Sequence, residues 1–301
     1  MGDLLEIGVA TYTDGPYYNL LFSERLHLDF YAAKNLLRLA RAFAATRRVI
    51  TDLDVFYQAA PPTPGSIAHL FPSPRLVPTY HGDEPYLTFT HRLSRSGETF
   101  VLADDETTRQ SGIYLATMPR PADEDMVMSS SVDALADTFE VVVKFTAQYH
   151  PEAHRLLATE GLAPKLHACL PVCGDLFMVV MDRVHGETAW KAGARGELLP
   201  YDVFKDIQDA VELLHSNNLV FGDLRTPNIM VVPGGSGLDG RHRGMLIDCD
   251  WVGAHGTGRY PASLNDSLQD WDLSGIQRNG IMDKAHDLAM LNKFKGRCHS
   301  V

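Results

Sequence analysis

The chain lacks long apolar runs and any excess of positive charge. No stretch of about 18 or more apolar residues occurs in its 301 residues, so the sequence predicts no membrane-spanning helix. The formal net charge is −11, which argues against a nucleic-acid-binding protein that depends on bulk electrostatic attraction. We therefore expect neither nucleic acid nor a membrane among its partners.

Cysteine is also scarce. The four cysteines, Cys169, Cys173, Cys249 and Cys298, are too few and too scattered for a disulfide framework. The first residues lack the basic segment and apolar run of a secretory signal, so we expect an intracellular protein, with the cytoplasm as the simplest location. His167, Cys169 and Cys173 could be imagined as zinc ligands, but no second pair at metal-finger spacing exists, and buried thiols are the simpler interpretation.

The chain does contain enough apolar sequence, 45% of its residues, for a sizeable core. Between Glu24 and Arg47 apolar residues recur at helical spacing with basic residues interleaved, and residues 1–60 are interpreted as a helical preface. Such a helix can bind an acidic partner or a membrane surface, although docking on its own protein is the simpler interpretation. The turn-rich segment Ala60–Ser66 is a plausible boundary. We expect a helical N-terminal extension over residues 1–80 and a separate domain over residues 81–301.

Within residues 81–301 the pattern begins with short β-like runs and becomes largely helical. The expected strands of the first half are Pro85–Leu93, Glu98–Ala103, Ile113–Thr117, Phe139–Phe145 and Leu176–Met181. Met118–Ala136 is expected to be an exposed loop. Later come helices at Pro151–Gly161 and Tyr201–Leu214, and short strands at Leu219–Phe221, Ile229–Val232 and Met245–Ile247. This order predicts an α+β fold with a β-rich N-lobe (about 81–182) and a helical C-lobe (about 183–301).

Two pairs of polar residues stand on these predicted elements. Lys144 ends the buried strand VVVK, where a lysine keeps its charge only if anions surround it, and Glu152 on the next helix is a natural partner. Alternatively, Lys144 simply reaches solvent from the strand end. Asp223 and Asn228 form an Asp-x4-Asn pair on the loop between two apolar strands, which alone could be a turn rich in side-chain-to-backbone hydrogen bonds.

A further carboxylate follows the apolar run MLI, at Asp248 of the segment Asp248-Cys249-Asp250. Phosphoryl transfer from a nucleoside triphosphate requires a cation on the phosphates, metal ions on the phosphate oxygens, and a carboxylate that orients the attacking hydroxyl. Lysine, the Asp-x4-Asn pair and Asp248 supply those groups in that order. Magnesium prefers one or two carboxylates plus phosphate oxygens, so Asp248 is the expected ligand, with Asp250 as a possible second one.

With these residues in that order, Tyr86–Phe294 resembles the protein-kinase superfamily, and within it the divergent kinase-like proteins found in fungi. The resemblance implies a compact bilobal fold, shortened at the C-terminus, that binds ATP and Mg²⁺. It implies that Lys144 contacts the phosphates and pairs with Glu152, and that the backbone of a hinge at Met181, Asp182, Arg183 and Val184 binds adenine. It also implies that Asp223 is the catalytic residue and that Arg225 contacts the transferred phosphate. Asn228 and Asp248 would bind Mg²⁺, and Asp287 would brace the catalytic loop.

The chain departs from that family in four places. No GxGxxG loop precedes VVVK, and Ser96-Gly97 is the one turn of that kind. Phe221-Gly222 stands where His-Arg is usual, so no arginine is available there to read a phosphorylated activation loop. Asp248-Cys249-Asp250 replaces Asp-Phe-Gly, and about fifty residues follow Asp248 without an Ala-Pro-Glu motif, so the usual helical platform for peptides is reduced.

Three functional hypotheses follow. The first is an active ATP- and Mg²⁺-dependent phosphotransferase (a kinase) that acts on a hydroxyl of a protein or a small molecule. The second is a catalytically weak pseudokinase that serves as a nucleotide- or protein-binding module, which the missing glycine loop favours. The third is an unrelated α+β protein with a fortuitous hairpin.

Overall fold

The chain divides into two compact units, Met1–Phe71 and Pro72–Val301, ahead of the boundary predicted at residue 80. The computed structural model describes residues 4–12, 16–25, 33–58, 71–77, 79–80, 82, 85–94, 97–101, 112–120, 138–172, 176–234, 240–262, 264 and 276–299. The predicted boundary segment Ala60–Ser66, Ser96, Cys173 and most of the predicted loop Met118–Ala136 lie outside the described residues.

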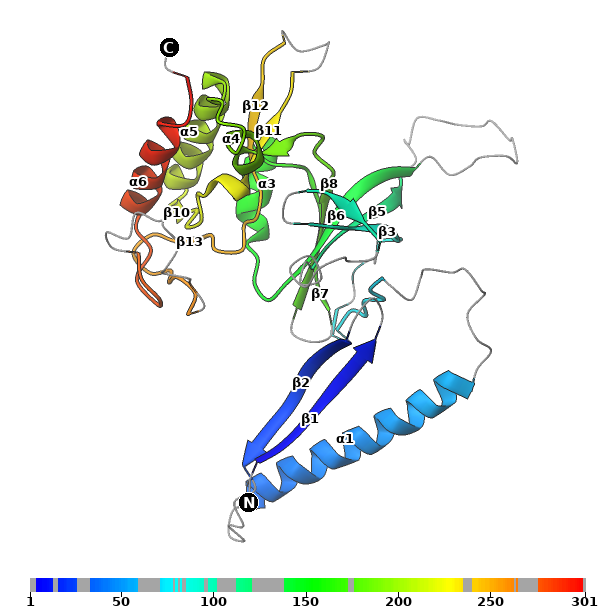
Figure 1. Ribbon diagram of the computed structural model, residues 1–301. Helices are drawn as coiled ribbons and strands as arrows, with labels where there is room; N and C mark the ends of the chain where they lie inside the picture. The colour runs from blue at the N-terminus through cyan, green and yellow to red at the C-terminus, as the bar shows by residue number, and fades with distance from the viewer. Residues whose placement is uncertain are drawn as a thin grey trace, which may run out of the picture. The chain divides into compact units, whose positions relative to one another are not determined.

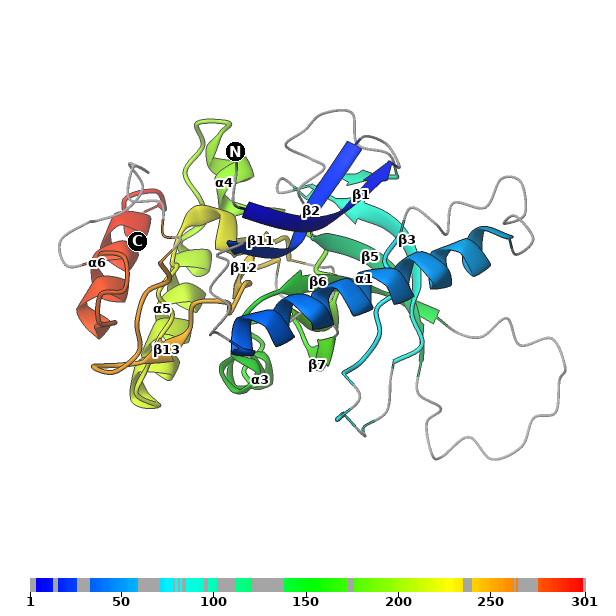
Figure 2. The same ribbon diagram turned by 90° about the horizontal axis from the view of Figure 1, so that it is seen from below.

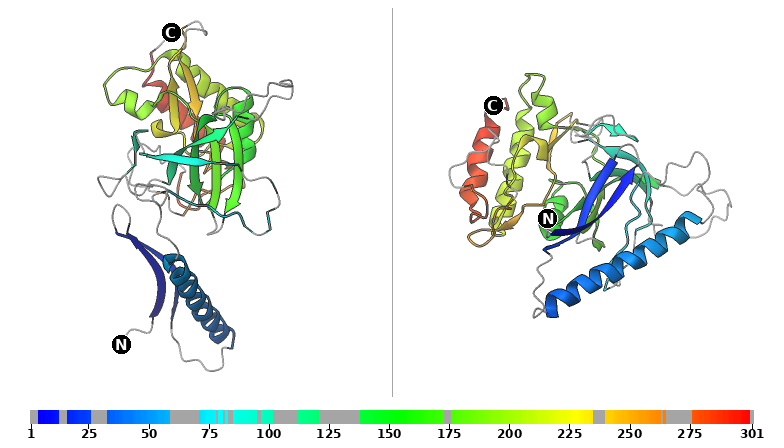
Figure 3. Two further views of the ribbon diagram at one scale, coloured as in Figure 1. Left: turned by 90° about the vertical axis from the view of Figure 1, so that its right-hand side faces the viewer. Right: turned by 60° about the horizontal axis from the view of Figure 1, so that its bottom comes forward.

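The first unit contains a β-hairpin as well as a helix (Figure 3). Strands β1 (Leu4–Tyr12) and β2 (Pro16–Arg25) pair antiparallel, and α1 spans Ala33–Gln58. The expectation of an entirely helical extension is therefore wrong for β1 and β2, whose β-branched and aromatic residues suit strands. Arg38 joins the helix to the hairpin, because its guanidinium lies 3.1 Å from the Glu24 carboxylate. None of the helices in the described part of the chain is long and apolar enough to cross a membrane.

The second unit begins with an antiparallel sheet of six strands in the order β4-β3-β5-β6-β8-β7 (Figure 1). Its strands are β3 (Thr88–Leu93), β4 (Thr99–Phe100), β5 (Ile113–Pro119), β6 (Thr138–Thr146), β7 (Leu166–Val172) and β8 (Leu176–Asp182). On β6, Val141 and Val143 are fully buried in the core on one face of this sheet. Because side chains alternate along a strand, Lys144 and Thr146 lie on the opposite face.

Helix α3 (Pro151–Thr159) connects β6 to β7 and contacts both β7 and α5, beside the sheet in Figure 2. It starts where the sequence predicts, with Pro151 in its first turn, and the His150 ring nitrogen accepts a hydrogen bond from the Ala153 N–H at 3.2 Å. Gly161, with φ +69°, follows the end of the helix. The prediction of this helix is confirmed.

The rest of the unit is mostly helical, with α5 and α6 in contact side by side (Figure 1). Its elements are β9 (Glu187–Thr188), α4 (Ala189–Gly193), α5 (Tyr201–Ser216), β10 (Leu219–Val220), a 3-10 turn η2 (Thr226–Asn228), β11 (Ile229–Val232), β12 (Arg243–Leu246), β13 (Gly253–Ala254) and α6 (Lys284–Lys295). The apolar face of α5 enters the main core, and α5 packs on β12. The predicted α+β architecture, a β-rich lobe followed by a helical lobe with a small hairpin, is confirmed.

Candidate active site

The hairpin of β11 and β12 brings Asn228 close to the segment that carries Asp248. Ile229 pairs with Leu246, and the ladder continues one step further, because the Ile247 N–H donates to the Asn228 carbonyl oxygen at 3.0 Å. Asn228 at the end of the predicted catalytic loop therefore lies opposite the residue that precedes Asp248. This register follows from two apolar runs, which bury Ile229 and Leu246 completely.

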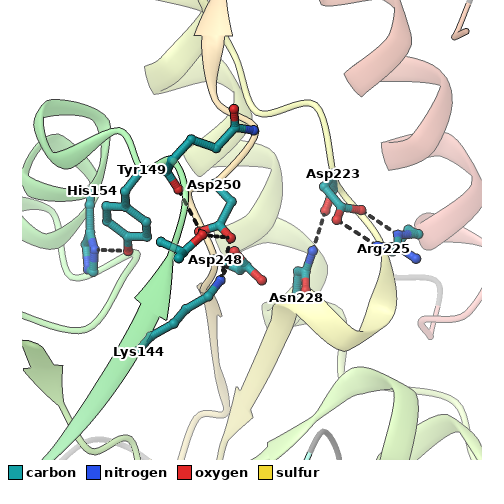
Figure 4. A network of polar contacts seen from close by, with 10 residues as sticks. Lys144, Tyr149, His154, Asp223, Arg225, Asn228, Asp248 and Asp250 are labelled. Atoms are coloured by element: carbon teal, nitrogen blue, oxygen red, sulfur yellow. Dashed lines mark hydrogen bonds and ion pairs between the residues drawn. The ribbon is translucent and has the colours of Figure 1, made fainter. Parts of the chain in front are cut away.

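Lys144 reaches the same place from the sheet (Figure 4). Its Nζ lies 2.5 Å from Asp248 Oδ1 and 2.8 Å from Asp250 Oδ2. The Thr146 hydroxyl, which shares the strand face of Lys144, lies 2.8 Å from the same Asp250 oxygen. Lysine and both carboxylates of the Asp248-Cys249-Asp250 segment thus form one network.

The network carries more negative than positive charge in a buried setting. Burial opposes the charged form of Lys144, but Asp248 and Asp250 outweigh it, and the pKa of the lysine is raised. Burial, followed by the charge of Asp248, raises the pKa of Asp250 to about 7. Burial acts in the same sense on Asp248, but the charge of Lys144 prevails there and lowers the pKa of that carboxyl. Asp248 is therefore the anionic partner of the lysine, and an added cation would relieve the repulsion between the two carboxylates.

The predicted pairing of Lys144 with Glu152 is wrong in this structure. The Glu152 side chain is 74% exposed, and its carboxylate lies 3.5 Å from the His150 ring instead. Glu152 occupies the first turn of α3, where an acidic group is favoured near the positive end of the helix dipole. Lys144 therefore finds its anionic partners on the segment that follows β12.

Asp223 and Arg225 form a closed ion pair within the predicted catalytic loop. Arg225 Nε lies 2.5 Å from Asp223 Oδ1 and Nη2 lies 2.7 Å from Oδ2, so the guanidinium contacts both carboxylate oxygens. Burial raises the pKa of Asp223, although Arg225 opposes that shift. The guanidinium carbon also lies 6.0 Å from the centre of the Trp251 ring, and Asn228 Nδ2 donates to the Asp223 carbonyl oxygen at 3.0 Å.

Asp287 contacts the backbone at the start of the loop that carries Asp223, as the family resemblance implies. Its carboxylate is 1% exposed and accepts the backbone N–H groups of Phe221 at 2.7 Å and Gly222 at 3.0 Å. His215 Nε2 at the end of α5 lies 3.0 Å from the same carboxylate. These are the contacts that the predicted bracing role requires.

Replacing Asp287 with alanine is expected to lower the free energy of unfolding by about 3 kcal/mol, because two buried N–H groups lose their acceptor. Urea unfolding followed by intrinsic fluorescence measures this change. The matched control is Asp209→Ala on α5, where the carboxylate is 43% exposed and bound to Lys205, and little loss is expected. Equal losses in the two variants would contradict the bracing role.

The backbone and the neighbours of Gly222 favour glycine at this position. Its φ is +81°, in the left-handed region that favours glycine. A Cβ at this position would clash with Met282 Cε and lie 3.1 Å from the Trp251 carbonyl oxygen. Met282 is held in place by backbone hydrogen bonds to Gly256 and Gly258.

The predicted hinge lies at the end of β8, where the chain leaves the sheet. Met181 is buried, and the Asp182 N–H donates to the Lys165 carbonyl at 2.9 Å. The Arg183 N–H donates to the Glu140 carbonyl at 3.4 Å. Both amides therefore already have acceptors in the protein.

The oxygen-bearing side chains at this site suit magnesium when phosphate oxygens complete its coordination. Asp250 Oδ1 is buried and finds no hydrogen-bond partner among the residues that the structure describes, whereas its other oxygen is held by Lys144 and Thr146. In the described ranges no group of three His, Cys, Asp or Glu residues could hold a metal by itself. Two carboxylates and the Asn228 amide would supply part of a shell, which is how Mg²⁺ is usually held beside a nucleotide.

Sequence reasoning missed three neighbours of this site: Thr146, Tyr149 and Trp251. Thr146 could have been found from the period of two that places it beside Lys144 on β6. Nothing local in the sequence indicates that Tyr149 lies near Cys249, or that Trp251 lies under Arg225, because those contacts depend on the folded chain.

The chain has few recorded similarities to known proteins. No protein-family model and no curated protein matches the chain. Among solved structures it is similar to the PK-1 kinase of the Cydia pomonella granulovirus, with 14% sequence identity and a TM-score of 0.43. The alignment covers 68% of this chain and 65% of the viral kinase, slightly less than two thirds of that protein. The elements described above form a β-rich part followed by a mostly helical part.

Proposed function

We propose that the protein is an ATP- and Mg²⁺-dependent phosphotransferase that acts on a hydroxyl group of a protein or a small molecule. The observation that carries the proposal is the meeting of Lys144 with Asp248, next to Asn228 and the loop of Asp223 (Figure 4). These groups come from strands and loops far apart in the sequence. A chance Asp-x4-Asn turn would not require a buried lysine beside it.

Each residue has a role that its position supports. Lys144 is proposed to leave its carboxylate partners in part and bind the α- and β-phosphates. Asp223 is proposed to orient the acceptor hydroxyl and receive its proton, and Arg225 to move from Asp223 to the transferred phosphate. Asn228 and Asp248 would hold Mg²⁺, which when bound neutralises charge on the phosphate oxygens. The backbone near Val184 is proposed to bind adenine.

One observation favours the second candidate, a binding module with little catalytic activity. Arg225 contacts both oxygens of the Asp223 carboxylate, so that no oxygen of Asp223 is left without a charged partner. If Arg225 stays there when nucleotide binds, the carboxylate is a poor acceptor for the proton of a hydroxyl group. The two candidates therefore differ in turnover and share nucleotide binding.

Thermal unfolding and phosphate release with Mg·ATP test the proposal. We expect Mg·ATP to raise the unfolding midpoint of the parent and to be hydrolysed slowly, with Lys144→Met losing most of both effects. The matched control is Lys205→Met, because Lys205 is bound to Asp209 on the exposed face of α5. Stabilisation without phosphate release would favour the binding module. No stabilisation of the parent by Mg·ATP would contradict the kinase and the nucleotide-binding module, and would leave a protein-binding module as the alternative.

A further inference from the structure

Thr146 is the last residue of β6, two positions after Lys144 and on the same face of the sheet. Both residues belong to the ladder with β8, in which Lys144 pairs with Val179 and Thr146 pairs with Phe177. Because threonine is branched at Cβ, a strand leaves its side chain few rotamers. The Thr146 hydroxyl is therefore a donor that the sheet holds at a fixed place beside the lysine.

The Thr146 hydroxyl has two acceptors within reach. Its oxygen lies 2.8 Å from Asp250 Oδ2 and 3.1 Å from the Gln148 carbonyl oxygen. An ionised carboxylate and a carbonyl can only accept, and the hydroxyl has one proton to donate. A hydrogen bond to a carboxylate is shorter and stronger than one to a neutral carbonyl. The hydroxyl therefore donates to Asp250, which is the nearer of the two acceptors.

The two carboxylate oxygens of Asp250 have different surroundings. Oδ2 accepts hydrogen bonds from Lys144 Nζ and from the Thr146 hydroxyl, both at 2.8 Å, and Figure 4 shows the lysine facing this carboxylate. Oδ1 is buried and finds no hydrogen-bond partner within the described ranges. A buried carboxylate oxygen without a partner costs free energy, which a bound ion can offset. Two donors on Oδ2 thus fix the plane of the carboxylate and leave Oδ1 for a cation.

We infer that Thr146 is a positioning residue, which holds Asp250 as a second Mg²⁺ ligand beside Asp248. This inference rests on the proposed function, in which Lys144 leaves its carboxylate partners in part and binds the nucleotide phosphates. Asp250 Oδ2 then loses some of its contact with the lysine. The short side chain of Thr146 stays with β6, so its hydroxyl is the donor that keeps the Asp250 carboxylate in place while nucleotide and metal are bound.

The test is a Mg²⁺ titration at fixed ADP, followed by thermal unfolding, for the parent, Thr146→Val and Thr146→Ser. We expect Thr146→Val to raise the Mg²⁺ concentration for half-maximal stabilisation about tenfold, as loss of groups that orient ligands commonly does. Thr146→Ser keeps the hydroxyl group and should restore the Mg²⁺ requirement of the parent. The control is Thr90→Val on β3, which β5 separates from β6, because its hydroxyl donates to the Leu115 carbonyl oxygen at 3.3 Å.

The outcomes separate this inference from the proposed function. A Mg²⁺ requirement of Thr146→Val equal to that of the parent would overturn it, even if the unliganded variant unfolded at a lower temperature, because that result is expected of strand packing alone. Equal increases in Thr146→Val and Thr146→Ser would also overturn it, because the hydroxyl group would then not matter. If the parent itself shows no Mg²⁺-dependent stabilisation by ADP, the proposed function fails and the inference fails with it.

Discussion

Asp223→Asn is expected to lower the rate of phosphate release from Mg·ATP about a thousandfold, within the range that a positioned general base contributes. The amide keeps the shape of the carboxylate but cannot take up the proton of the attacking group. Binding of Mg·ATP should change by about twofold or less, because Asp223 is not expected to contact the nucleotide in the ground state. Single-turnover phosphate release and calorimetric binding measure the two quantities separately.

Asp209→Asn is a suitable control for this variant, because it removes one carboxylate from an exposed position on α5. The ion pair with Arg225 makes the result informative in a second way. If Asp223→Asn kept the parent's turnover, Asp223 would be only the anchor of Arg225, and the assignment of a catalytic role to it would be wrong.

Asp248→Asn is expected to weaken the Mg²⁺-dependent part of nucleotide binding about a hundredfold, because it removes the carboxylate that stays most readily ionised at the site. Lys144 would keep Asp250 as a partner, so the sheet and the turn should remain joined. Calorimetric titration of ADP with and without Mg²⁺ isolates the metal-dependent component. In metal-free buffer the variant and the parent should bind ADP similarly.

The comparison variant is Asp250→Asn, with a smaller expected effect on the same measurement. Asp250 Oδ2 is engaged by Lys144 and Thr146, although its other oxygen has no hydrogen-bond partner within the described part of the chain. If Asp250→Asn weakens metal-dependent binding more than Asp248→Asn does, the principal ligand is Asp250, and the assignment to Asp248 is wrong.

Much of the second unit could be predicted because its buried elements have strong local patterns. The expected strand Phe139–Phe145 and helix Tyr201–Leu214 match β6 and α5 to within a few residues, and Ile229–Val232 matches β11. These elements are continuous apolar runs or have one apolar face, so burial and local preference agree. The expected helix of the N-terminal unit exists but begins at Ala33 and ends at Gln58, later than predicted at both ends.

What could not be predicted depends on contacts between distant residues. Strand β7 contains His167, Cys169 and Pro171, which do not suggest a strand until the chain is seen to pair with β8. The hairpin of β1 and β2 was not predicted, and its strands are identified by their pairing from Leu4 with Arg25 to Tyr12 with Pro16.

The site shows the same limit. Sequence order placed Lys144, Asp223, Asn228 and Asp248 on the right elements, because each stands at the end of an apolar run. Order alone gives no side-chain direction, however, and so it selected Glu152 on α3 as the partner of the lysine. The structure turns Glu152 outward and supplies Asp248 and Asp250 instead.

The close packing of Gly222 against Met282 also limits how this chain could change over evolutionary time. The family resemblance in the sequence would place an arginine at position 222. In this structure such a side chain has no space until Met282 becomes smaller and the left-handed backbone at position 222 relaxes. Either step alone loosens the loop that Asp287 braces. An arginine at position 222 would therefore need at least two coupled substitutions, the first of which carries a loss of stability.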